Sequence, residues 1–426
     1  MDTDISKYLR QGLGRAAAFI RAEPPERYRD ALLYACQHDV RYDRQCEDDR
    51  AVYLYDLIAL TTEPDFYRGA VLNALASGDP EFNGYALTQM FALARRFAQD
   101  GHRESHRILY RVFARDGFSE GVSCAEELVG LDGIKGLIFT LRYLVKEEES
   151  EQLWQFERLV SKLEEREGKD VAQQAIQHAA RFRPRLAKWR EESRLNAEDH
   201  VRSSQPERPR LDYAGIRSLI QAGTNRFGLL WDWGKEATEE DLAHAAEDLL
   251  AESDDGRLLN YLRVFRNRRF PGPTVRLLDL VRTGEWRLAH AVKAALVHVG
   301  GADIRACALG LLDRSDRLGL AVELLAATSE PGDYRMIESL LERPLADFEY
   351  HSLGFGVLDF VKANPRHEAS RSLTLLYENG PCSVCRRGCV RQLLARGLFP
   401  NWMRQECRYD AYIHTRNLVN GIEEEE

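Results

Sequence analysis

The sequence has no run of apolar residues that approaches the roughly 20 needed for a helix to cross a bilayer, so a membrane protein is not expected. Its first residues, M-D-T-D-I-S-K, are too acidic and polar for a secretory signal, which makes the cytoplasm the expected location. Segments of alternating apolar and polar residues are missing as well, which argues against a sheet. There is no P-loop, G-x-S-x-G motif or paired-carboxylate motif, so no common catalytic class is indicated.

Positive charge is also in short supply. The chain holds 59 Lys and Arg against 68 Asp and Glu, a net charge of -9, which argues against general affinity for nucleic acid because phosphates are bound mainly by Lys and Arg. The charged fraction of 30% and the hydrophobic fraction of 44% are typical of a soluble folded protein. Eight cysteines are scattered through 426 residues without a secretory context, which favours free thiols or a metal site over a disulfide framework.

Apolar residues with helical periodicity occur along most of the chain. Apolar residues recur at a spacing of about 3.6 through the first two hundred residues, for example at Val52, Tyr55 and Leu60. Turn signals such as Pro24-Pro25 and Asp132-Gly133 divide this part into successive helices. We therefore predict an N-terminal helical, solenoid-like domain over residues 1–195. Residues 196–210 lose the periodicity and contain two prolines, which predicts a linker or a long loop.

The stretch Glu285–Leu325 contains a repeated helical pattern. Trp286-Arg287 opens one apolar helical run, and Ile304-Arg305 opens the next one eighteen residues later. Small residues occupy the positions at which a neighbouring helix would pack closely, namely Ala289, Ala306 and Ala308. An acid, an apolar residue and an Arg recur at Asp333-Tyr334-Arg335 and, more loosely, at Asp410 to Arg416. This pattern indicates stacked helix pairs.

The repeated pattern resembles the HEAT and armadillo class of α-solenoid repeats. Over Leu211–Asn420, particularly at P-C-S-V-C-R and E-C-R-Y-D, the chain is similar to bacterial HEAT-repeat-like proteins of unassigned activity. The resemblance implies an all-α fold, a right-handed superhelical solenoid of stacked helix pairs, with residues 211–426 as a C-terminal HEAT-like repeat domain. It implies no activity.

A cysteine cluster is the most specific chemical feature. Cys382 and Cys385 have C-x-x-C spacing at the start of a predicted helix, Cys389 lies one turn further on, and Cys407 could complete a tetrahedron from the next helix. Four thiolates suit Zn²⁺. A helix N-terminus beside arginines would also favour a redox-active thiolate. The third interpretation is that the four cysteines are small buried hydrophobic residues of a helix pair.

Two windows rich in arginine carry candidate partner-binding residues. Gly256–Leu278 has six arginines and no acid, and directly follows Glu236–Asp255 with nine acids and no Lys or Arg. Asn379–Gln405 also lacks acids, and Arg181–Arg190 has five positive residues in ten. A basic surface could hold phosphates or an acidic peptide. Alternatively, the acidic and basic windows neutralise one another across a helix pair. The candidate binding residues are Arg263, Arg266, Arg268, Arg269, Arg386 and Arg387.

The segment Leu229–Gly234 contains Trp231, Asp232 and Trp233. Trp beside Asp in a helical cleft resembles the residues with which HEAT-like alkylpurine DNA glycosylases are thought to hold a damaged nucleotide. This resemblance would give the three residues a catalytic role. The simpler interpretation is that two aromatic residues cap the first repeat of the C-terminal array, because analogy of residue types does not establish activity.

The sequence therefore predicts a non-catalytic interaction scaffold that binds a protein or peptide on a concave helical surface. The alternative is a nucleic-acid-binding solenoid, with base excision of the alkylpurine glycosylase kind as its enzymatic form. A further alternative is a small zinc or redox thiol site in the C-terminal repeats. Zinc is the one cofactor that the residues suggest, and no membrane partner is expected.

Overall fold

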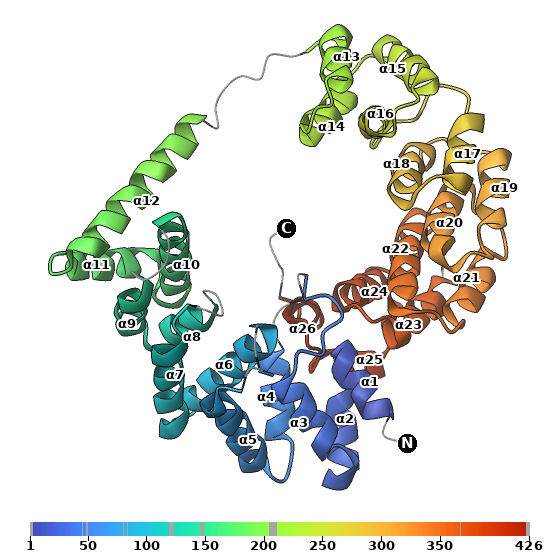
Figure 1. The fold of residues 1–426 in the computed structure, drawn as a ribbon. Helices are drawn as coiled ribbons and strands as arrows, with labels where there is room; N and C mark the ends of the chain where they lie inside the picture. The colour runs from blue at the N-terminus through green and yellow to red at the C-terminus, as the bar shows by residue number, and fades with distance from the viewer. Residues whose placement is uncertain are drawn as a thin grey trace. The chain divides into compact units, whose positions relative to one another are not determined.

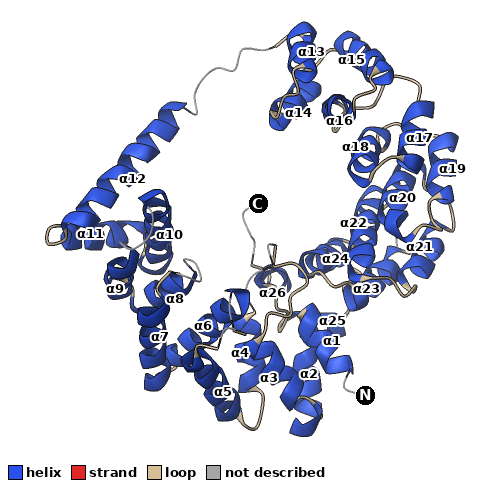
Figure 2. Cartoon of the chain, in the orientation of Figure 1, coloured by secondary structure: helices blue, strands red, loops and turns tan. Residues whose placement is uncertain are grey.

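The computed structural model describes residues 3–44, 46–47, 50–79, 81–82, 84–118, 123–144, 149–203, 211–366 and 368–422. Over these residues the chain forms 26 α-helices, three short 3-10 helices and no strand (Figure 1, Figure 2). This confirms the all-α class. No helix in the described ranges is both long enough and apolar enough to span a membrane.

The chain divides into two compact units. The first consists of Met1–Glu207 together with Trp402–Asn420, and the second of Arg208–Asn401 together with Gly421–Glu426. The helices of the first unit are α1 (Thr3–Gln11), α2 (Arg15–Ala22), α3 (Arg29–Gln37), α4 (Ala51–Ala59), α5 (Pro64–Ser77), α6 (Gly84–Gln99), α7 (Arg103–Asp116), α8 (Ser123–Asp132), α9 (Ile134–Leu144), α10 (Glu149–Glu167), α11 (Lys169–Ala180), α12 (Pro184–Ser203), α25 (Asn401–Cys407) and α26 (Ile413–Asn420), with the 3-10 helix η1 (Pro25–Arg27).

The second unit contains twelve α-helices among its described residues. They are α13 (Tyr213–Gln221), α14 (Phe227–Glu236), α15 (Glu239–Ala251), α16 (Asp255–Val264), α17 (Val275–Thr283), α18 (Trp286–Leu296), α19 (Ala302–Gly310), α20 (Leu318–Leu325), α21 (Asp333–Leu341), α22 (Asp347–Ala363), α23 (Ala369–Asn379) and α24 (Ser383–Ala395), with the 3-10 helices η2 (Ser315–Arg317) and η3 (Ala326–Thr328).

Helices in each unit pack mainly on the next helix and on the next but one. In the second unit α14, α16, α18, α20, α22 and α24 touch in succession, and α13 packs on α15, α17 on α19 and α21 on α23 (Figure 1). In the first unit α4, α6, α8, α10 and α12 form a similar succession. Apart from α25 and α26, the helices therefore bury their apolar stripes mainly against helices close to them in the sequence, as periodic amphipathic segments require.

Four arginine side chains of the second unit reach back to the end of a helix two places earlier. Arg268, Arg314, Arg343 and Arg396 donate hydrogen bonds of 2.8–3.0 Å to the carbonyl oxygens of Lys235, Arg282, Leu312 and Val361, which lie 31 to 35 residues earlier. The last carbonyl groups of a helix have no partner within the helix, and a cation is favoured there by the helix dipole. The same contact therefore recurs at nearly constant spacing along the second unit.

Local sequence signals mark several helix ends correctly. Thr238 caps α15, since its hydroxyl accepts a 3.1 Å hydrogen bond from the backbone N–H of Asp241. Gly133, with a φ of 58°, separates α8 from α9 at the expected Asp132-Gly133 break. In the repeated stretch Ala289 and Ala308 are buried as expected, whereas Ala306 is exposed because it lies on the outer side of α19.

The expected linker over residues 196–210 is helical in its first part, because α12 continues to Ser203. Its first proline comes only at position 206, so nothing before that residue must end the helix. Residues 204–210 lie outside the described residues.

The last two helices pack in the first unit rather than with the repeats that precede them. Arg15 and Glu406 form a 2.7 Å ion pair, and the backbone N–H of Ala411 donates to the carbonyl oxygen of Gly12 at 2.8 Å. Arg416 reaches Asp56 of α4 at 2.6 Å. The segment Trp402–Asn420 thus belongs structurally with α1 to α4, whereas the sequence predicted one domain over residues 211–426.

Candidate functional site

A cluster of one imidazole and two thiols lies between α22 and α24; we call it the thiol site. Cys382 is the N-cap of α24, Cys385 lies in the first turn of that helix, and His351 projects from α22. The sulfur of Cys385 is 3.5 Å from Nδ1 of His351, and the three donor atoms all lie within 4.8 Å of one another. Both thiols are buried, with 1% and 3% of their surface exposed, and His351 is half-buried.

The pKa values of the two thiols at this site are shifted in opposite directions. The hydrogen bond from the Cys385 thiol, the N-terminal turn of α24 and nearby His351 together lower the pKa of Cys382 despite its burial. The same hydrogen bond, together with burial, raises the pKa of Cys385 well above its usual value. Cys382 is therefore the thiol that exists as a thiolate most readily.

The four cysteines singled out in the sequence do not all join this cluster. Cys389 is fully buried, its pKa is raised by that burial, and it is not among the clustered donors. Cys407 ends α25 and belongs to the first unit. All eight cysteines are free thiols. Two of the predicted ligands are thus brought together, and the residue that accompanies them is a histidine.

The arginines of the Gly256–Leu278 window have varied partners. Arg268 pairs with Glu239 at 2.5 Å, and Arg257 pairs with Glu252 at 2.9 Å, so the adjacent acidic and basic windows neutralise one another in part. Arg263 stacks over the ring of Phe227 at 3.6 Å, and Arg266 over Trp231 at 4.2 Å. These guanidinium groups occupy ring faces on which a base could otherwise stack.

Three further predicted binding arginines differ in their accessibility. Arg269 is exposed and makes no ion pair or hydrogen bond with its side chain in the described part of the chain. Arg386 is buried with 1% of its surface exposed, and Arg387 is half-buried. A guanidinium as buried as that of Arg386 cannot be the first contact for a partner.

The side chains of the Trp231–Trp233 segment contact different parts of the structure. The indole N–H of Trp233 donates to the carbonyl oxygen of Leu211 at 2.8 Å, and its ring packs against Tyr213. Asp232 is exposed and pairs with Lys235 at 3.3 Å. Since Trp231 packs against Arg266, the three residues do not converge on one cleft, and this geometry gives the glycosylase alternative no support.

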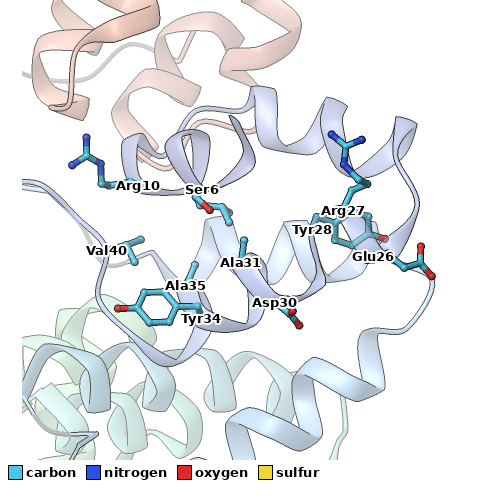
Figure 3. Close-up of a pocket in the computed structure, with 11 residues that line it drawn as sticks. Ser6, Arg10, Glu26, Arg27, Tyr28, Asp30, Ala31, Tyr34, Ala35 and Val40 are labelled. Carbon is cyan, nitrogen blue, oxygen red and sulfur yellow. The ribbon is translucent and has the colours of Figure 1, made fainter. Parts of the chain in front are cut away.

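Described residues of the first unit line at least two cavities. The first, of about 550 Å³, is lined from α1, η1 and α3 and carries charges of both signs, with Arg10, Arg27, Glu26 and Asp30 among the residues that line it (Figure 3). The second, of about 580 Å³, we call the Phe182 groove. It is lined by Ile138, Leu141, Arg142, Phe182, Arg183, Pro184, Arg185, Leu186 and Trp189.

The Phe182 groove combines an apolar surface with positive charge and no acid. Trp189 is buried against Phe156, whereas Phe182 is 72% exposed. In the described residues, the side chains of Arg142, Arg183 and Arg185 make no hydrogen bond or ion pair. Such a groove can take an apolar group that has carboxylates on either side.

No protein-family model, curated protein or solved structure matches this chain. The resemblance to HEAT-repeat proteins therefore stays a prediction, and function has to be inferred from the residues of the chain itself.

Two features of these sites are not indicated by the local sequence. His351 stands alone in an apolar helix, but it lies 34 residues before Cys385, within the spacing at which arginines connect helices two places apart. That spacing is the signal that could have identified it. The Arg181–Arg190 window is basic by its sequence, whereas Arg142 joins the same groove from α9, and no local pattern indicates this contact.

Proposed function

We propose that this protein is an interaction scaffold of the α-solenoid kind, which binds an acidic segment of another protein in the Phe182 groove. The observation that carries the proposal is the groove's apolar surface beside three arginines that have no acidic partner among the described residues. Guanidinium groups without an acidic partner among the described residues, next to an exposed Phe, can bind carboxylates.

The solenoid part of the proposal is supported by the packing order. Most of the described helices pack on the next helix and the next but one, and four arginines reach back 31 to 35 residues to helix ends in the second unit. Nearest-neighbour packing at a constant spacing is what stacked helix pairs require. Scaffolds of this kind bind partners along extended helical surfaces.

The charge distribution favours an acidic protein segment over nucleic acid as the partner. The chain as a whole carries a net charge of -9, which repels a long phosphate polymer, whereas three arginines around one groove attract a short segment locally. An apolar side chain flanked by Glu or Asp would bury its apolar surface against Phe182 and Trp189 while its carboxylates meet the guanidinium groups.

The proposal is tested by fluorescence polarisation with the labelled peptide Glu-Glu-Leu-Phe-Glu-Glu-Leu-Leu-Glu-Glu and the intact chain. We expect binding in the micromolar range, weakened by salt because the contact is charge-assisted. The double variant Arg183→Glu/Arg185→Glu should weaken it about tenfold or more. Phe182→Ala should weaken it as well, through loss of the apolar contact.

The matched control is Arg181→Glu/Arg190→Glu, which makes the same charge change in the same segment without altering a residue of the groove. It should leave most of the affinity intact. A second control replaces every Glu of the peptide by Lys. If the control variant weakened binding as much as the groove variant, or if a 12-nucleotide DNA strand bound more tightly than the peptide, the proposed partner class would be wrong.

A further inference from the structure

Two helices of the second unit bring three metal-binding side chains together. His351 comes from α22, while Cys382 and Cys385 come from the N-terminal end of α24, and their donor atoms lie within 4.8 Å of one another. Imidazole nitrogen and thiolate sulfur are the ligands that Zn²⁺ prefers. The C-x-x-C spacing allows both sulfurs to face one point, because the first Cys precedes the helix and the second lies in its first turn.

We propose that His351, Cys382 and Cys385 form a Zn²⁺ site that connects α22 to α24. In a tetrahedral site with Zn–S of about 2.3 Å and Zn–N of about 2.1 Å, the sulfur and the nitrogen are roughly 3.6 Å apart. The sulfur of Cys385 and Nδ1 of His351 are 3.5 Å apart, which fits this geometry. The fourth position would be taken by water or by a further donor.

The charges at the site also suit a divalent cation. Two thiolates and a neutral imidazole carry a charge of -2, which Zn²⁺ neutralises, and this matters because both sulfurs are buried. The ring of Phe355, one turn after His351, packs edge-on against the imidazole at 4.7 Å and fixes its orientation.

Burial favours a metal site over a redox pair. Thiol–disulfide exchange requires a partner to reach a sulfur atom, but Cys382 and Cys385 expose only 1% and 3% of their surface. A small ion needs much less access than a protein or a disulfide substrate. The proposal is independent of the proposed scaffold function, which concerns the first unit.

The test measures metal bound by the full chain purified without chelators, by mass spectrometry and by Co²⁺ titration. We expect about one Zn²⁺ per chain, and Co²⁺ should give the visible bands of tetrahedral sulfur coordination. Cys382→Ser and Cys385→Ser should each lose the metal, and His351→Ala should lower Co²⁺ affinity at least tenfold.

The matched control is Cys389→Ala, because Cys389 lies on the same helix, is equally buried and is outside the cluster. It should keep the metal and the Co²⁺ spectrum. If a serine variant failed to fold, the wild-type Co²⁺ spectrum and the His351→Ala titration would still decide the question. Metal-free protein that gives no Co²⁺ spectrum, a Cys382–Cys385 disulfide in the purified chain, or equal loss of metal in Cys389→Ala would overturn the proposal.

Discussion

Arg305 and Asp333 form a two-pronged ion pair between α19 and α21. The two nitrogens of the guanidinium group donate to the two carboxylate oxygens at 2.9 and 2.8 Å, and Arg305 also donates to the carbonyl oxygen of Thr328 at 2.9 Å. The residues are the Arg of one acid–apolar–Arg pattern and the acid of the next. The sequence pattern therefore corresponds to a physical connection between successive helix pairs.

Replacing Asp333 by Asn should destabilise the second unit by about 2 kcal/mol, because a mostly buried guanidinium would lose the more buried of its two carboxylate partners and keep only the exposed Glu330. Burial alone would raise the pKa of Asp333, but hydrogen bonds from Arg305 and from the backbone N–H of Glu330 outweigh it and hold the pKa below its usual value. Urea unfolding at pH 7, monitored by circular dichroism, measures the loss.

The pH dependence has a definite sign. An unfolded Asp titrates near pH 3.9, so the stabilisation from the charged carboxylate is fully present above that pH and is lost as the pH falls through the lower folded value. The gap between wild type and Asp333→Asn should therefore shrink at low pH. Asp303→Asn is the control, since Asp303 holds the matching position in the preceding pattern and is exposed. An equal loss in both variants would refute the role of the ion pair.

The helices could be predicted from local sequence signals, whereas the contacts between residues far apart in the sequence could not. The 3.6-residue spacing and the cap at Thr238 act within a few residues, so they are visible in the sequence. Arg15 and Glu406 are 391 residues apart, and nothing local indicates that Trp402–Asn420 packs on the first helices. For the same reason only part of the thiol site could be predicted. The C-x-x-C pair is a local pattern, whereas His351 lies 34 residues before Cys385.

Gly14 lies against the backbone of α25. A Cβ at this position would be 1.8 Å from the carbonyl oxygen of Glu406, so the start of α2 and α25 can approach this closely only because Gly14 has no side chain. Gly14→Ala should therefore loosen the packing of Trp402–Asn420. Hydrogen exchange should then show loss of protection at the backbone N–H of Ala411, which donates to Gly12.

The control for Gly14 is Gly69→Ala in α5. A Cβ at Gly69 would have no heavy atom within 4 Å, and Ala is favoured over Gly inside a helix by about 1 kcal/mol. This variant should be as stable as wild type or more stable, with Ala411 still protected. Full protection of Ala411 in Gly14→Ala would show that the contact is not tight.

Arg276 should be important for stability and Arg269 should not, although both lie in the same basic window. The guanidinium of Arg276 donates to the carbonyl oxygens of Leu249, Leu250 and Glu252 at the end of α15, whereas Arg269 is exposed and its side chain makes no such contact with a described residue. Arg276→Met should cost about 1–2 kcal/mol in urea unfolding, because carbonyl groups lose their donors. Arg269→Met should stay within about 0.5 kcal/mol of wild type.

His290 should make the second unit sensitive to mild acid. Burial, Lys293 and Arg317 lower its pKa to about 4, and its ring packs against Trp286 at 4.4 Å. An unfolded His takes up its proton near pH 6.5, so between these two values the unfolded state binds more protons and stability falls as the pH falls. From pH 7.5 to 5.0 wild type should lose about 1 kcal/mol more than His290→Gln, after allowance for the partial exposure of the ring. Urea unfolding at both pH values measures the difference, and His298→Gln, which alters an exposed imidazole, should keep the pH dependence of wild type. If His290→Gln retained that dependence too, the loss would have to arise from other groups, because only a proton taken up at position 290 is removed by this substitution.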